Sequence, residues 1–121
     1  MASPEVEALA ALLSLALDDS TVTEWRDALA QLVPCENVFI KISGLNTFTR
    51  SLDEAVMDIA SNTALDMFGP ERCFFGSNFP VEAMWTSFED YTAMQKKIFA
   101  GRSDAENEKF FHDTAINFYN L

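Results

Sequence analysis

Two short apolar segments, separated by one long helical pattern, restrict the fold of this chain more than any other feature of its sequence. Residues 37–43 are rich in β-branched side chains, and residues 72–77 contain a second apolar run. Between them, Ser51 and Glu54 have the spacing of a capping box, and Gly69 followed by proline ends the helical pattern. A strand, a helix of about fifteen residues and a second strand predict a crossover that joins two parallel strands. The expected fold class is therefore α/β.

Sequence signals for helix starts continue on both sides of this unit. Ser3, Pro4 and Glu5 have the pattern of a helix N-terminus, so we expect an additional helix of unknown role within residues 1–19. Capping residues indicate three further helix starts, at Thr21 with Glu24, at Ser87, and at Ser103 with Glu106. The predicted order is thus two helices, a strand, a helix, a strand and two helices.

Two strands are too few for a parallel sheet that is buried on both faces, because such sheets contain about five or six. Further strands must therefore come from another chain, or this chain must be part of something longer.

The composition excludes several classes of partner. The formal net charge is −11, from 19 acidic and 8 basic residues, and the basic residues do not cluster. Nucleic acids and anionic membrane surfaces need clustered Lys and Arg, so neither is an expected partner. Cys35 and Cys73 have no paired spacing, and no apolar stretch has the features of a signal peptide or a membrane span. We expect a soluble cytoplasmic protein with two free thiols.

Three segments taken together indicate a family. Residues 24–45 contain a W…LA…NVFIKISGL pattern, residues 68–81 read FGPERCFFGSNFPV, and residues 111–119 read FHDTAINFY. In order and spacing, these segments resemble the amidohydrolase-related (amidohydrolase-2) family, in which the middle segment reads FGPxRxxFGSDxPV. The resemblance extends over residues 20–121.

The resemblance implies a (β/α)8 barrel, of which this chain would be only the C-terminal part. Residues 37–43 would be the seventh strand and residues 72–77 the eighth. Members of the family are mostly metal-dependent hydrolases or decarboxylases that act on small carboxylates, lactones or related rings. A divalent metal such as zinc or manganese is therefore implied for a full-length relative, held mainly by histidines of earlier strands that this chain lacks.

The resemblance also places Asn78 where the family has an aspartate. An aspartate can ligate a cation and accept a proton from metal-bound water. An asparagine has a carbonyl oxygen and an NH2 group but no titratable base. Asn78 is therefore the candidate catalytic residue, orienting a substrate carbonyl or carboxylate rather than acting as a base. The alternative is that its side chain bonds the loop backbone before Phe79. Substrate-binding residues are not assigned.

Other polar residues carry weaker signals. His112 is the only histidine, and an imidazole-based metal site normally needs two or three, so we expect no metal site in this chain. Lys41 and Ser43 share one face of the first strand and can both point into a pocket. For Lys41, a structural pairing with a carboxylate is favoured over a catalytic role. Glu82 is a carboxylate near the end of the second strand, without an assigned role.

Three functional hypotheses follow. The favoured one is the C-terminal portion of an amidohydrolase-2-type hydrolase, inactive alone and requiring the missing N-terminal strands, or associating with itself. The second is a non-catalytic binding or structural module. The third is a half-barrel subunit completed by a separate chain. Only the first and third imply a small-molecule substrate.

Overall fold

The computed structural model describes residues 5–6, 19–44, 46 and 50–121. Its strands and helices, in chain order, are β1 (Glu5–Val6), α2 (Asp19–Ala30), β2 (Phe39–Ile42), α3 (Glu54–Phe68), β3 (Cys73–Phe75), α4 (Phe88–Ile98), α5 (Asp104–Glu108) and α6 (Thr114–Tyr119). Short helical turns occupy Pro70–Arg72, Val81–Met84 and Phe99–Gly101, and a wider π-type turn, η4, covers Lys109–Asp113 between α5 and α6. None of the helices in the described ranges is long and apolar enough to cross a membrane.

The described strands form one parallel sheet in the order β1-β2-β3. Ile40 is paired with Cys73 and Ile42 with Phe75, so the predicted parallel pair is confirmed, although both strands are shorter than expected. The prediction of a helix starting at Ser3 is wrong at Glu5 and Val6, the two residues of its first turns that the structure describes. Glu5 and Val6 are a strand, because their backbone pairs with Phe39 and Ile40 of β2. Residues 7–18 of that predicted helix lie outside the described residues.

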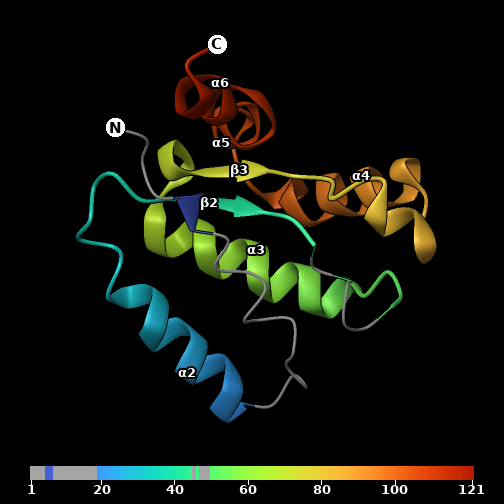
Figure 1. Ribbon diagram of the computed structural model, residues 1–121, viewed down its shortest axis with the longest axis horizontal. Coiled ribbons are helices and arrows are strands. Elements are labelled where there is room, and N and C mark those ends of the chain that lie inside the picture. The colour runs from blue at the N-terminus through green and yellow to red at the C-terminus, as the bar shows by residue number, and fades with distance from the viewer. Residues whose placement is uncertain (1–4, 7–18, 45, 47–49) are drawn as a thin grey trace.

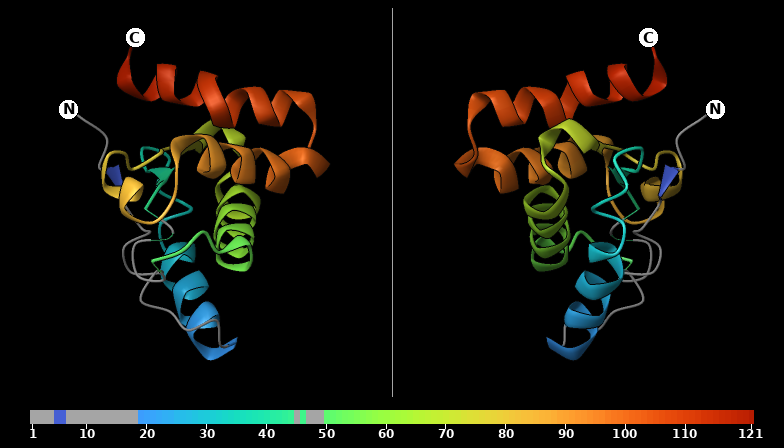
Figure 2. Two further views of the ribbon diagram at one scale, coloured as in Figure 1. Left: turned by 90° about the vertical axis from the view of Figure 1, so that its right-hand side faces the viewer. Right: turned by 90° about the vertical axis from the view of Figure 1, so that its left-hand side faces the viewer.

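Helices lie beside the sheet and over its β3 edge (Figure 1). The helix α3 contacts both β2 and β3, while η4 and α6 contact β3. Figure 2 shows α5, η4 and α6 as one continuous helical rod that crosses above the sheet. This arrangement leaves the carboxyl ends of β2 and β3 next to each other, since the strands are parallel.

Aromatic side chains cover both faces of β3. Phe75 packs on Tyr91 and Phe111, with ring centroids 5.8 Å and 5.4 Å away. Phe74 is fully buried and packs on Phe118 and Tyr119 of α6, at 5.2 Å and 5.6 Å. Successive residues of a strand point to opposite faces, so these two residues anchor two separate aromatic clusters. The core thus continues across the sheet.

Three predicted helix ends are confirmed. The side chain of Ser87 accepts a hydrogen bond from the backbone of Asp90, and Ser103 with Glu106 forms a complete capping box. Gly69 ends α3 with a positive φ of 82°.

Two further predicted helix starts, besides the one at Ser3, are wrong. The capping box expected at Thr21 does not start a helix, because α2 already includes Asp19. The helix α3 is capped by Asp53 rather than Ser51. The Asp53 carboxylate accepts a hydrogen bond from the backbone N–H of Val56 at 3.1 Å, and α3 therefore begins at Glu54.

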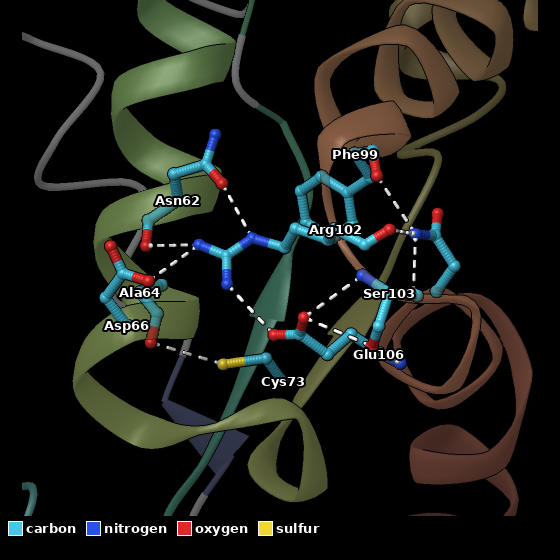
Figure 3. A network of polar contacts seen from close by, with 9 residues as sticks. Asn62, Ala64, Asp66, Cys73, Phe99, Arg102, Ser103 and Glu106 are labelled. Atoms are coloured by element: carbon cyan, nitrogen blue, oxygen red, sulfur yellow. Dashed lines mark hydrogen bonds and ion pairs between the residues drawn. The ribbon is translucent and has the colours of Figure 1, made fainter.

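A polar network centred on Arg102 connects α3 to the start of α5 (Figure 3). The guanidinium donates to the Asn62 side chain at 2.8 Å, to Asp66 at 2.7 Å and to Glu106 at 3.1 Å. A planar guanidinium can satisfy several acceptors at once, whereas a lysine ammonium has a single nitrogen. Arg102 therefore fixes the connection after α4 against α3.

Candidate functional site

A pocket of about 470 Å³ opens beside the carboxyl end of β3. Its lining comes from the ends of β2 and β3, from the loop that follows β3, and from α6: Lys41, Ser43, Phe74, Phe75, Gly76, Ser77, Asn78, Phe79, Ala115 and Tyr119. The predicted site residue Asn78 and the predicted pair Lys41 and Ser43 are therefore brought to one pocket.

Gly76 allows the two strand ends to approach each other this closely. Its backbone N–H donates to the carbonyl oxygen of Ile42 at 2.9 Å. A Cβ atom at residue 76 would lie 2.7 Å from Cβ of Ser43 and 2.9 Å from Cε of Lys41, closer than real Cβ atoms come to their neighbours. The absence of a side chain at Gly76 thus leaves room for both polar side chains beside β3.

Asn78 occupies the left-handed region of backbone space, with φ of 55°. Its amide nitrogen donates a hydrogen bond to Oε1 of Glu82 at 3.1 Å. The backbone N–H of Phe79 instead bonds to Oγ of Ser77, at 3.3 Å. The alternative in which Asn78 bonds the loop backbone is therefore wrong, because Ser77 makes that contact.

Glu82 is a buried carboxylate directly behind Asn78, and its side chain is fully enclosed. The indole N–H of Trp85 donates to its second oxygen at 2.9 Å. Tyr91 lies close by, and its hydroxyl donates to the carbonyl oxygen of Gly76 at 3.0 Å. Burial, together with the negative charge of Glu82, raises the pKa of the Tyr91 hydroxyl. Tyr91 therefore serves as a hydrogen-bond donor and stays neutral.

Lys41 reaches toward α6 across the pocket. Its ammonium donates to the hydroxyl of Tyr119 at 3.4 Å and lies 6.0 Å from the centroid of the Tyr119 ring. Neither contact was expected from the sequence, because 78 positions separate the two residues. Among the described residues that line the pocket, Lys41 brings the positive charge, beside the hydroxyl, amide and aromatic groups of its neighbours.

His112 lies away from this pocket, in η4, and its side chain is 68% exposed. Its Nδ1 is 2.8 Å from the carboxylate of Asp113. Within the described ranges, no three His, Cys, Asp or Glu side chains are grouped closely enough to hold a metal ion. The Asn78 amide offers one weak oxygen ligand at best. These residues alone do not fit a catalytic metal site, which needs about three protein ligands.

Glu82, Trp85 and Tyr119 are the residues of this region that sequence reasoning left without a role. The spacing of Glu82 four residues after Asn78 is the one local signal that could have connected the pair. Nothing local connects Tyr119 to Lys41.

The chain is similar in sequence to two longer proteins. It is 35% identical over 97 residues to the uncharacterised protein y4mH of Sinorhizobium fredii (strain NBRC 101917 / NGR234). This alignment covers 80% of this chain and 33% of that protein. It is 32% identical over 118 residues to L-fucono-1,5-lactonase of Burkholderia multivorans (strain ATCC 17616 / 249). This alignment covers 92% of this chain and 40% of the lactonase.

Solved structures show the same similarity in three dimensions. An amidohydrolase from Burkholderia multivorans with bound HEPES matches 97% of this chain and 43% of its own length, with a TM-score of 0.83 and 31% identity. A zinc-bound crystal structure, also of an amidohydrolase from Burkholderia multivorans, matches 92% of this chain and 40% of its own length, with a TM-score of 0.80 and 31% identity.

The chain spans between 33% and 43% of the lengths of these proteins. The expected fold is confirmed: β1, β2 and β3 with their helices form the C-terminal part of a (β/α)8 barrel. The sequence model of the amidohydrolase family matches residues 10–121. The match begins ten residues before residues 20–121, over which the motifs showed the resemblance. The chain belongs to the amidohydrolase family.

Proposed function

We propose that this chain supplies the C-terminal strands of a metal-dependent hydrolase that opens a lactone or acts on a related small carboxylate. The observation that carries the proposal is the pocket at the carboxyl ends of β2 and β3, where Asn78, Lys41 and Ser43 meet. Loops at this end of a parallel barrel converge on the active site. The 32% identity to an L-fucono-1,5-lactonase supports a lactone as substrate.

In this proposal the pocket residues bind and orient the substrate. The Lys41 ammonium attracts the carboxylate that forms when a lactone opens, and the hydroxyl of Ser43 supplies a neutral hydrogen bond. Asn78 orients a polar group of the substrate and cannot accept a proton. The divalent metal, zinc or manganese, supplies Lewis acidity and an acidified water when it is bound. The zinc bound to the similar amidohydrolase supports a metal of this kind, and its ligands would come from strands outside this chain.

The remaining strands must come from a longer chain, from a partner chain or from a second copy, so the 121-residue chain alone is expected to be inactive. We also propose a cytoplasmic location, which is supported by the free thiols of Cys35 and Cys73.

A chimera tests the proposal. Residues 10–121 of this chain would replace the matching portion of the Burkholderia lactonase, and hydrolysis of L-fucono-1,5-lactone would be followed with zinc or manganese and after chelation. We expect metal-dependent hydrolysis by the chimera and none by the isolated chain. The variant Asn78→Leu should lower kcat/KM of the chimera, and the exposed control Asn120→Leu should not. A folded, zinc-loaded chimera without lactonase activity would overturn the proposal.

A further inference from the structure

Glu82, a buried carboxylate outside the pocket, lies directly behind Asn78, which lines the pocket. Glu82 is fully enclosed and is absent from the pocket lining, whereas Asn78 is part of it. The two residues are connected twice. The Glu82 backbone N–H donates to the Asn78 carbonyl at 3.0 Å, and the Asn78 amide donates to the Glu82 carboxylate at 3.1 Å.

The chemistry of the two side chains determines which way the amide points. An ionised carboxylate only accepts hydrogen bonds, so the NH2 group of Asn78, and not its oxygen, must face Glu82. The Trp85 indole is only a donor, and it occupies the other carboxylate oxygen. Within the described part of the chain, no donor is hydrogen-bonded to Oδ1 of Asn78.

We propose that Glu82 is a positioning residue that fixes the Asn78 amide with its nitrogen inward and its carbonyl oxygen toward the pocket. Asn78 then acts as a hydrogen-bond acceptor for ligand groups that donate, such as the hydroxyls of a polyhydroxylated lactone. This role revises the expectation that Asn78 orients a substrate carbonyl or carboxylate, because such groups would need the NH2 group of Asn78 as their donor. The assignment of a ligand rests on the proposed function, whereas the orientation of the amide does not.

The same geometry disfavours an aspartate at residue 78. Asn78→Asp would place a partly buried carboxylate at hydrogen-bond distance from the fully buried carboxylate of Glu82, where like charges disfavour the ionised pair. The asparagine in this chain is thus matched to the glutamate four residues later.

An exchange of the two side-chain types tests the orientation in the 121-residue chain. In Glu82→Gln, the Trp85 indole still requires the side-chain oxygen, so the new amide nitrogen faces Asn78, and the Asn78 amide can turn over. We expect a small change in Tm. Asn78→Asp should lower Tm by roughly 10 °C. The double variant Asn78→Asp with Glu82→Gln should recover most of that loss, because residue 82 now donates to residue 78.

The matched controls are Asn120→Asp and Glu89→Gln, which make the same changes of charge at exposed sites. When these two control substitutions are combined, their shifts in Tm should be additive. If the shifts of Asn78→Asp and Glu82→Gln are also additive, the proposed pairing is overturned.

A spectroscopic readout separates positioning from general stability. The side-chain NH2 signals of Asn78 should exchange with solvent at least about tenfold more slowly than those of the exposed Asn120, and Glu82→Ala should remove this protection. Equal exchange rates in the unmodified chain would overturn the proposal. Neither readout needs a substrate, so both remain decisive if the chimera shows no lactonase activity.

Discussion

The hydroxyl of Tyr91 donates a 3.0 Å hydrogen bond to the backbone carbonyl of Gly76 and thereby joins α4 to the end of β3. Tyr91 is fully buried, and Gly76 comes two residues before Asn78. The position of the pocket loop relative to the helices therefore depends in part on one side-chain hydroxyl.

Tyr91→Phe is expected to lower the free energy of unfolding by about 1–2 kcal/mol, because a buried carbonyl oxygen loses its hydrogen-bond donor while the ring packing is kept. Urea denaturation measures this change. Tyr119→Phe, which removes a hydroxyl from a side chain that is much more exposed, is the control and should cost less. Equal losses of unfolding free energy in the two variants would show that the hydrogen bond from Tyr91 to Gly76 does not stabilise the fold more than an exposed hydroxyl does.

Gly76→Ala should cost about 1–3 kcal/mol, because the added methyl group would overlap Ser43 and the stem of Lys41. The same overlap pushes Lys41 from its place beside Tyr119, so the variant should also change the shape of the pocket. Gly101→Ala is a matched control, since a Cβ atom there would meet nothing within 4 Å. Urea denaturation of the two variants should give a clear loss only for Gly76→Ala.

The sequence predicted those elements of the fold whose signals are local. The strands β2 and β3, the stop of α3 at Gly69 and the caps at Ser87 and Ser103 each depend on neighbouring residues, and all are present. The strand β1 was missed because two residues are too few to show a periodic pattern. Only its pairing with β2 makes it a strand, and Ser3, Pro4 and Glu5 imitate a helix start.

The candidate site divides in the same way. Lys41 and Ser43 could be placed together, because alternate residues of a strand share a face. The spacing of Glu82 from Asn78 was too weak a signal to predict its role, because the contact depends on how the chain turns between Asn78 and Trp85. Tyr119 reaches Lys41 only through the packing of α6 over β3. Contacts between elements that are distant in sequence have no signature in a single sequence.

Arg102→Lys should lower the free energy of unfolding by about 1–3 kcal/mol, because a single ammonium cannot replace the contacts to Asn62, Asp66 and Glu106 together. The Arg102 side chain is only 18% exposed, so solvent screens these contacts incompletely. Arg50→Lys, at an exposed position, is the control and should be close to neutral. Thermal unfolding in low and high salt would measure both variants, and equal Tm values would contradict the network's role.

Stability should fall as the pH rises above about 9, because two buried acids resist ionisation. Burial raises the pKa of Cys73 from 9.0 to about 12, and burial also raises the pKa of Tyr91. The unfolded chain releases these protons first, so the stabilisation is complete below pH 9 and is lost as the pH rises toward 12. The slope should be on the order of 1 kcal/mol per pH unit for each group.

Urea denaturation between pH 8 and pH 11 would measure this slope. Cys73→Ala should flatten the dependence just above pH 9, whereas Cys35→Ala should not, because Cys35 is exposed. An unchanged slope in Cys73→Ala would show that other groups determine the alkaline loss.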